Sequence, residues 1–445
     1  MRTRLMGLTL LFLFLLGPAA LGGSSVSKID SFKLENGLTV LIRHVTSAED
    51  AAVVVLYKVG NRQDPEGRSG MASLIAALYH AAGTARTAAR APESLWPRWP
   101  KGAKRALGWT QVAADDHTLL ARTLEVKDIA AEVDDAADRM AGLTVTEQDI
   151  EKAVSSLVER LDNLDRGVVP PETARLRARE LVVPLPHGGR RPGRAVEVTK
   201  VTFEEVRKRL KQLYVPANAI LSITGEVSVV KLRAQIEKRF GAIASGGPPT
   251  APPPPMEAPA RDPKAPPEVI DAPAAKAPAA ALALRAPSPG AAPEYAAWLV
   301  LVVRLCDAAQ VEMFGRPPST EALLVNIDIL QDAEAVYLVW RAAGAADPAA
   351  SGDRLRSMLS AATTKPTSQA DFLRTRAGYN MHFGVAPTEG GWGDSPLGVA
   401  HADARRTQLG IDGDALMRLV SAVTATDLAA AARRTTAIVV VRPGK

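Results

Sequence analysis

The prediction of the fold depends on residues 70–84, which read GMASLIAALYHAAGT. This apolar run follows a Gly-containing turn, and its spacing predicts a helix over residues 70–82. Residues at i, i+3, i+4 and i+7 share one face of a helix, and here they are Ser73, Ala76, Ala77 and His80. Only the imidazole of His80 among these four side chains is a zinc ligand.

The same stretch resembles the zinc-binding helix of the M16 peptidases, the pitrilysin and insulinase family, which reads roughly Gly-Leu-Ala-His-x-x-Glu-His before Gly-Thr. Residues 70–72 match the start of that pattern and residues 83–84 match its end. In the family pattern the two histidines bind zinc and the glutamate activates the metal-bound water. Ser73 and Ala77 stand at the histidine positions, and Ala76 stands at the glutamate position. The resemblance implies a degenerate member with the fold, without zinc and without catalytic residues.

The segments around this helix follow the order seen at the start of an M16 domain. Phe32–His44 predicts a hairpin, and Ala51–Val59 predicts a buried strand. Tyr214–Asn218 precedes a strand at Ala219–Gly225, as in the unit that closes the family's first domain. Further predicted strands are 107–113, 117–122, 279–285, a pair within 327–341, and 437–442. Further predicted helices are 127–141, 147–163, 201–213, 229–240, 293–309, 351–362, 368–379, 411–422 and 426–434.

The second half of the chain repeats the order of the first half in outline, and M16 chains contain two homologous domains. The resemblance therefore implies an α+β fold of two M16-type (LuxS/mitochondrial-processing-peptidase-like) α/β domains, each a mainly antiparallel sheet packed with helices. The Pro/Ala-rich residues 246–264 predict a linker. The expected divisions are a signal peptide at 1–25, an N-terminal domain at 28–245, this linker, and a C-terminal domain at 265–445.

A third zinc ligand in active M16 peptidases is a glutamate on the helix that corresponds to residues 147–163. By its place in this helix Glu159 is the nearest match, and Glu151 is the alternative. Both also fit an exposed, charged helix face. One imidazole and one distant glutamate are fewer than the three protein ligands of a catalytic zinc. We therefore expect His80 to be satisfied by packing or solvent.

A Gly-rich loop offers a candidate for peptide binding. Gly390, Gly391, Trp392 and Gly393 lie in the segment EGGWGD. Noncatalytic subunits of family processing peptidases handle substrate with a Gly-rich loop, and this loop looks superficially similar. An ordinary connector is the alternative.

The N-terminus has the pattern of a signal peptide. Arg2 and Arg4 precede the apolar run Leu8–Leu16, and small residues follow at 17–23. We expect cleavage near residues 20–25 and a periplasmic or secreted protein with no membrane span after cleavage, with an uncleaved anchor as the alternative. Lys and Arg exceed Asp and Glu by 54 to 48, without a basic run interleaved with aromatics. This pattern argues against binding to nucleic acid.

Three functions follow from the resemblance. In the first, the protein is an exported noncatalytic subunit that pairs with an active zinc M16 peptidase, or with a second copy of itself, and helps to enclose or present peptides. In the second, it is a stand-alone binding or scaffold protein on the same fold. In the third, it is an active zinc metalloendopeptidase with unrecognised ligands.

Overall fold

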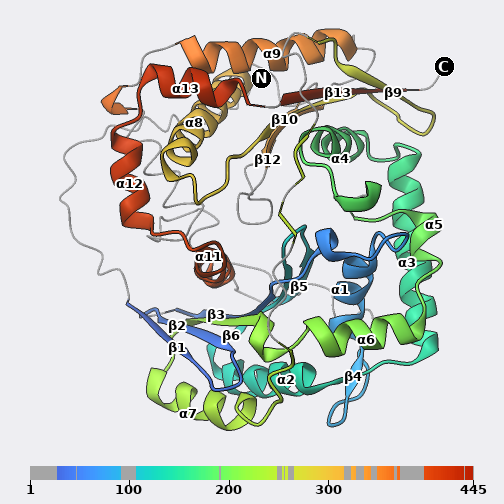
Figure 1. Ribbon diagram of the computed structural model, residues 1–445, viewed down its shortest axis with the longest axis vertical. Helices are drawn as coiled ribbons and strands as arrows, with labels where there is room; N and C mark the ends of the chain where they lie inside the picture. The colour runs from blue at the N-terminus through green and yellow to red at the C-terminus, as the bar shows by residue number, and fades with distance from the viewer. Residues whose placement is uncertain are drawn as a thin grey trace, which may run out of the picture.

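Two β-sheets, one in each half of the chain, organise the computed structural model of the protein (Figure 1). The residues that the structure describes are 28–46, 48–91, 107–189, 192–247, 253–254, 256–258, 265–314, 322–326, 335–341, 348–364, 368–370, 395–434 and 436–443. The predicted signal peptide and most of the predicted linker lie outside these residues.

The first sheet, as described, has six strands in the order β1-β2-β8-β3-β6-β5. Neighbouring strands are antiparallel except β2 and β8, which are parallel. The hairpin predicted from residues 32–44 is present, with Phe32 opposite Val40. The strands are β1 (Ile29–Lys33), β2 (Thr39–His44), β3 (Asp50–Tyr57), β5 (Gly108–Ala113), β6 (Thr118–Glu125) and β8 (Ala219–Gly225). Strand β5 forms one edge of this sheet.

Helices of the N-terminal half pack around this sheet. Helix α1 contacts β5, β6 and α3, and α2 packs between β3 and α7. These helices are α1 (Met71–Ala81), α2 (Ile129–Ala141), α3 (Glu147–Asp165), α5 (Ala195–Val198), α6 (Phe203–Leu213) and α7 (Val229–Phe240). A small sheet joins β4 (Gly83–Thr84) to β7 (Leu143–Thr144). The core is mainly aliphatic, as expected from a chain with 4% aromatic residues.

The second sheet, within the described residues, has the order β11-β12-β10-β13-β9. Adjacent strands in this sheet are antiparallel, except β13 and β9, which are parallel. The buried Trp298 and Trp340 lie in the core between this sheet and its helices. The strands are β9 (Glu268–Ala272), β10 (Ala279–Arg285), β11 (Ala322–Asn326), β12 (Ala335–Arg341) and β13 (Thr436–Pro443), and the helices are α8 (Ala292–Phe314), α9 (Pro348–Thr364), α12 (Gly413–Ser421) and α13 (Ala425–Ala432).

Each half also contributes one helix to the sheet of the other half (Figure 1). Helix α4 (Pro170–Val182) follows α3 in sequence but packs on β10, β12 and β13. Helix α11 (Pro396–Leu409) belongs to the C-terminal half but packs on β3, β8 and β6. Small side chains make both contacts close, since Ala400 packs on β3 and β6 and Ala178 packs on β10 and β13. The two halves therefore interlock.

Buried ion pairs accompany these exchanged helices. Arg43 of β2 donates from Nε and Nη2 to the two carboxylate oxygens of Asp403 in α11, each at 2.8 Å. Arg405 Nη1 lies 3.1 Å from Asp116 Oδ2. Because a charge buried without its partner costs about 3–5 kcal/mol, these pairs fix where α11 sits on the first sheet.

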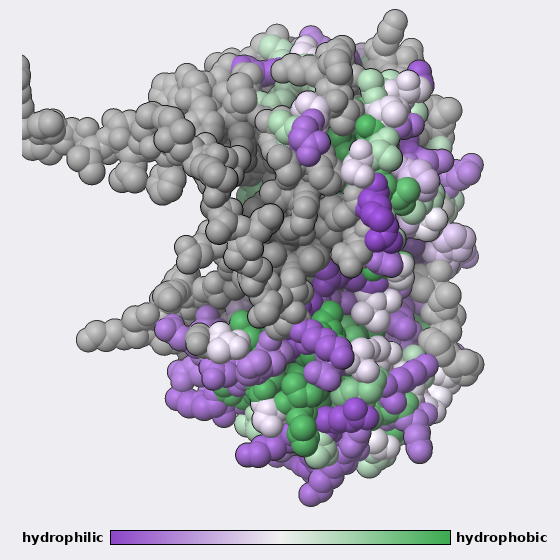
Figure 2. All heavy atoms as spheres, turned by 90° about the vertical axis from the view of Figure 1, so that its left-hand side faces the viewer, coloured by the Kyte–Doolittle hydropathy of each residue, from purple (hydrophilic) through white to green (hydrophobic). Residues whose placement is uncertain are grey.

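Most predicted elements are present, with shifts of a few residues at their ends. Helices α4 and α11 are not among the elements predicted from the sequence. Of the strand pair predicted within 327–341, the second member is β12, and residues 327–334 lie outside the described residues. Most of the helix predicted at 368–379 lies outside the described residues. On the face shown in Figure 2, hydrophilic side chains surround smaller hydrophobic areas over the N-terminal half. In the described part of the chain, no helix is long and apolar enough to cross a membrane.

Candidate functional site

Helix α1 begins at a glycine for a steric reason. Gly70 has a φ of 103°, and a Cβ there would lie 2.6 Å from the Val198 side chain. Glycine cannot cap the helix with a side chain, and the carboxylate of Asp64 does so instead. It accepts hydrogen bonds from the backbone N–H groups of Gly70 and Ala72 at 2.8 and 2.9 Å. The loop before α1 therefore fixes where the helix starts.

A cavity of about 890 Å³ lies beside α1. Ser73, Ala76 and Ala77 all line it, so the structure brings the three vestigial positions together on one wall. Helix α3, strand β5 and helix α4 supply other walls. The lining residues outside α1 are Ala82, Ala89, Arg90, Gln111, Val112, Ala113, Asp149, Lys152, Ala153, Ser156, Leu157, Arg160, Glu172, Arg175, Leu176 and Pro192.

The residues of this cavity do not fit a zinc ion. The Ser73 hydroxyl donates to Asn61 Oδ1 at 3.2 Å, and the two alanines offer no lone pair. The two carboxylates of the lining have other partners, because Asp149 accepts from the Thr146 backbone N–H and Glu172 pairs with Arg175. None of the described lining residues is a histidine. In the described part of the chain, no group of three or more His, Cys, Asp or Glu side chains could hold a metal ion.

Neither candidate for the third ligand faces this cavity. The α3 residues that line it are spaced three or four apart, and they are Asp149, Lys152, Ala153, Ser156, Leu157 and Arg160. Glu151 and Glu159 are exposed and lie outside that set. The structure thus places both glutamates on an exposed face of α3, which is the alternative that the sequence offered for them. On the face that does approach them, Ala153 is a partly buried alanine.

His80 is buried and does not line the cavity. Its Nε2 lies 3.3 Å from the carbonyl oxygen of Thr110. The centroid of its ring lies 4.5 Å from the centroid of the Trp109 ring. Burial, together with the nearby charge of Arg139, lowers the pKa of His80 to about 3, so the ring is neutral at pH 7. His80 is packed against the edge of the sheet, outside the cavity lining that Ala76 and Ala77 form.

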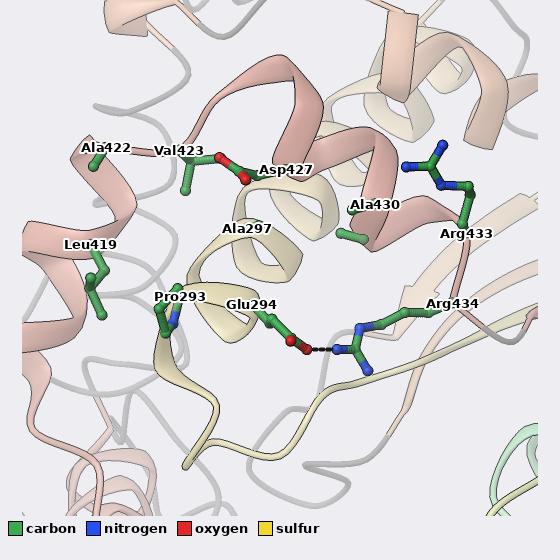
Figure 3. Close-up of a pocket in the computed structure, with 11 residues that line it drawn as sticks. Pro293, Glu294, Ala297, Leu419, Ala422, Val423, Asp427, Ala430, Arg433 and Arg434 are labelled. Carbon is green, nitrogen blue, oxygen red and sulfur yellow. Dashed lines mark hydrogen bonds and ion pairs between the residues drawn. The ribbon is translucent and has the colours of Figure 1, made fainter.

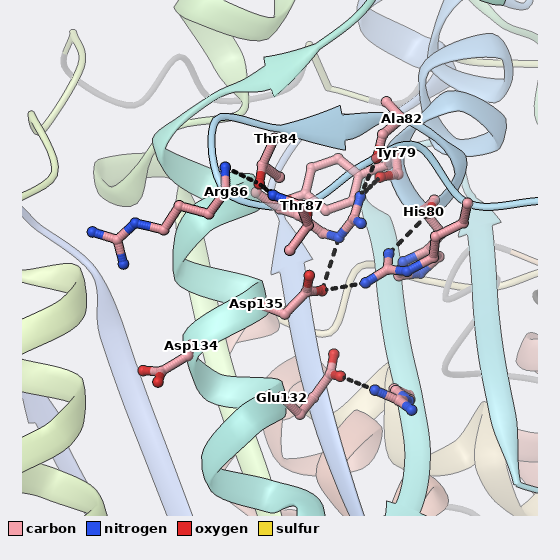
Figure 4. A network of polar contacts seen from close by, with 12 residues as sticks. Tyr79, His80, Ala82, Thr84, Arg86, Thr87, Glu132, Asp134 and Asp135 are labelled. Carbon is pink, nitrogen blue, oxygen red and sulfur yellow. Dashed lines mark hydrogen bonds and ion pairs between the residues drawn. The ribbon is translucent and has the colours of Figure 1, made fainter.

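A buried polar network holds the C-terminal end of α1 (Figure 4). Arg139 of α2 donates to the carbonyl oxygens of Tyr79 at 2.6 Å and Ala82 at 2.9 Å. Arg90 donates to the carbonyl oxygen of His80 at 2.9 Å. Both guanidinium groups also contact Asp135 Oδ2, at 2.8 and 2.7 Å. The last carbonyls of a helix have no partner within it, and here two arginines satisfy them.

The residues of this network are not among the site residues predicted from the sequence. The one local signal is the spacing of Asp135 and Arg139, which are four residues apart on α2 and form an ion pair. The guanidinium groups of Arg90 and Arg122 also lie over the Trp109 indole, at 4.2 and 4.6 Å from the ring centroid. These contacts join α1, α2 and β5 next to the cavity.

Strand β5 brings to the cavity a sheet edge on which no second described strand pairs. Gln111, Val112 and Ala113 line the cavity, and among the described strands β5 pairs only with β6. Asn61 donates to the carbonyl oxygen of Ala113 at 3.0 Å at one end of the strand. An unpaired strand edge offers backbone N–H and C=O groups to another extended segment.

A second cavity, of about 410 Å³, lies in the C-terminal half between α8, α12 and α13 (Figure 3). Glu294 and Arg434 pair with each other across it. Most of the other lining residues are apolar, and they are Pro293, Ala297, Leu419, Ala422, Val423, Ala430 and Ala431. The Gly-rich loop of Gly390, Gly391, Trp392 and Gly393 lies outside the described residues.

Residues 200–312 match the family model described as the peptidase M16 inactive domain. Solved structures extend this result to most of the chain. A peptidase M16 inactive domain from Pseudomonas fluorescens superposes with a TM-score of 0.71 and 14% identity, covering 94% of this chain and 98% of that one. The chain has the M16 peptidase fold. The expected resemblance and the expected α+β fold class are therefore confirmed.

Two further M16-fold structures are similar over nearly the same length. A protease from Helicobacter pylori has a TM-score of 0.71 and 17% identity, covering 94% of this chain and 100% of that one. The periplasmic protease PqqL from Escherichia coli has a TM-score of 0.67 and 14% identity, covering 93% of this chain but 47% of that one. No curated protein sequence matched this chain. The M16 fold here thus corresponds to about half the length of PqqL.

Proposed function

We propose that the protein is an exported, noncatalytic M16-like subunit that binds peptides in extended form in the cavity beside α1. The observation that carries this proposal is that the cavity coincides with the edge of β5, on which no second described strand pairs. A cavity of about 890 Å³ has the size of a ligand site. Its vestigial positions are Ser73, Ala76 and Ala77, and none of these can bind zinc or activate water. The match to an inactive-domain family model supports the absence of catalysis.

The binding mode follows from the wall that β5 forms. An extended peptide placed along this edge would pair with backbone groups of β5, as peptides do when they add a strand to a sheet. Its side chains would then alternate between the cavity and the opposite side. Gln111 and Val112 lie next to the small side chains of α1 in this arrangement. The peptide is held and is not cleaved.

A partner is expected because the chain corresponds to 47% of the longer PqqL chain. We propose that an active zinc M16 subunit, or a second copy of this chain, supplies the other half of an enclosing assembly. The leader-like residues 1–25 and the likeness to a periplasmic protease support a periplasmic or secreted location. Co-purification from the native host, followed by light scattering, tests this pairing. A monomer that captures no M16 peptidase would favour the stand-alone binding protein.

Two neighbouring serines of α3 allow a matched test of the site. Both serines are exposed, but Ser156 lines the cavity and Ser155 does not. We expect Ser156→Trp to fill the cavity and to weaken binding of a pool of fluorescein-labelled decapeptides at least tenfold by anisotropy. Ser155→Trp should bind like the wild type. Equal binding by the two folded variants, or cleavage of the peptides by the wild type, would contradict the proposal.

A further inference from the structure

The charged side chains in the wall of the α1 cavity are not balanced. Among the described residues, four cations and two carboxylates line it, and they are Arg90, Lys152, Arg160, Arg175, Asp149 and Glu172. Arg175 pairs with Glu172 at 2.6 Å, and Arg90 pairs with Asp135 at 2.7 Å. The remaining carboxylate, Asp149, accepts hydrogen bonds from Thr146 at the start of α3. Two cations of α3 are therefore left without compensation from the cavity wall.

The sequence of α3 explains why these two cations, Lys152 and Arg160, stay uncompensated. On a helix, a side chain reaches partners three or four residues away. Around Arg160 these positions are Ser156, Leu157, Asn163 and Leu164, none of which is acidic. Around Lys152 the one acidic position is Asp149, which already accepts bonds from Thr146. Within the described part of the chain, neither cation has an ion pair within 4.0 Å.

We propose that the α1 cavity selects peptides with acidic side chains, whose carboxylates bind Lys152 and Arg160. This inference rests on the proposed peptide-binding function and names its substrate class. The active M16 pattern places the positive charge of zinc at α1, whereas here two fixed cations on α3 provide positive charge in the same cavity. Cations in a concave wall raise the local concentration of anionic ligands and favour their association.

The spacing of the two cations suggests which acidic peptides fit. Eight residues of helix separate Lys152 from Arg160, a rise of about 12 Å along α3. In an extended peptide, side chains four residues apart point to the same side and are separated by about 13 Å. A peptide that runs alongside α3 with acidic residues at i and i+4 therefore matches both cations at once.

The test uses the full mature chain and three labelled decapeptides with one framework of Ser, Thr and Val. At positions i and i+4 they carry two glutamates, two glutamines or two lysines, and each is made with a free and an amidated C-terminus. We expect the glutamate peptide to bind about tenfold more tightly than the glutamine peptide at low salt, with the lysine peptide weakest. The difference should shrink at 1 M salt. It should persist with an amidated C-terminus if side chains supply the anion.

Substitutions in the chain test whether Lys152 and Arg160 cause the preference for the glutamate peptide. Lys152→Gln combined with Arg160→Gln should remove the preference for glutamate, so that the glutamate and glutamine peptides bind this variant with similar affinity. The matched control is Lys231→Gln combined with Lys238→Gln, which removes two exposed cations from α7, outside the cavity. The control should keep the preference. Circular dichroism confirms that each variant is folded.

The outcomes separate this inference from the proposed function. Peptides that bind equally whatever their charge would overturn the acidic preference and leave the proposed function standing. A preference that survives in Lys152→Gln/Arg160→Gln, or that disappears on amidation, would also overturn it. If no peptide binds the wild type, the proposed function fails and this inference fails with it.

Discussion

Helix α1 has an anchored end and an open face, and the two differ in what they preserve. At the anchored end, Arg139 and Arg90 satisfy the carbonyl oxygens of Tyr79, His80 and Ala82 through a buried network. On the open face, Ser73, Ala76 and Ala77 present small side chains to a cavity. The position of the helix is thus held by several strong contacts, whereas the residues that would make it a zinc site are missing. The difference indicates that the contacts that hold α1 in place do not depend on zinc-binding residues on its open face.

The largest effect is expected when the contacts of Arg139 at the anchored end of α1 are removed. In Arg139→Met, two buried carbonyls lose their donor and Asp135 keeps only Arg90 as a guanidinium partner. We expect the free energy of unfolding to fall by about 3–5 kcal/mol in urea titrations followed by circular dichroism. The control is Arg418→Met, which removes an exposed arginine and should change stability by about 0.5 kcal/mol or less. Similar losses in both variants would mean that Arg139 does not anchor α1.

Restoring the chemistry of the open face is the next test. Ser73→His, Ala76→Glu and Ala77→His place two imidazoles and a carboxylate on the cavity wall. Ala153→Glu should add the third ligand, because Ala153 lines the same cavity. We expect calorimetry to show zinc binding about 100-fold tighter in the fourfold variant than in the threefold one, since each ligand contributes roughly 3 kcal/mol.

The larger side chains of this design can overpack the site by about 1–3 kcal/mol each, so folding is checked by circular dichroism. Equal zinc affinity in the two variants would show that Glu159 or Glu151 reaches the metal. That result would contradict the rotation of α3 seen here. The unmodified mature protein is expected to hold no stoichiometric zinc, which elemental analysis can measure.

A smaller effect is expected from pH at the anchored end. Burial raises the pKa of Glu132 to about 7, although Arg122 opposes this shift from 2.6 Å. A carboxyl whose pKa rises on folding stabilises the fold below its unfolded pKa, near 4.3, and that contribution is lost as pH rises to 7. As the pH rises from 4.5 to 7.5, the free energy of unfolding of Glu132→Gln should therefore increase by about 2 kcal/mol relative to that of the wild type. A difference in unfolding free energy that is flat with pH would contradict this.

The smallest effect is expected on the open face itself. Ser73→Ala removes one hydrogen bond of 3.2 Å at the cavity wall and should cost less than about 1 kcal/mol. The neighbouring Leu74 is completely buried in the core, and Leu74→Ala should cost about 2–5 kcal/mol. Thermal unfolding of the two variants measures how sharply the two faces of α1 differ. Equal costs would mean that the cavity wall is packed as tightly as the core.

The sequence by itself determined the local elements and the missing chemistry. Helix α1, the hairpin of β1 and β2, and the strand β8 follow from periodicity and turn residues close together in the chain. The loss of the zinc site is equally local, because Ser73, Ala76 and Ala77 lack ligand atoms whatever surrounds them. The resemblance to the M16 family rests on the same short segments.

Only the tertiary structure decided how α3 is turned and where α4 and α11 lie. Periodicity shows which residues share a helix face, but it does not show which face meets a neighbour, so Glu159 and Ala153 could not be told apart. Helix α11 escaped detection because its buried Asp403 and Arg405 interrupt the apolar pattern of a core helix. Their partners, Arg43 and Asp116, lie hundreds of residues earlier in the chain. Such contacts form only when the two halves interlock, and no local pattern records them.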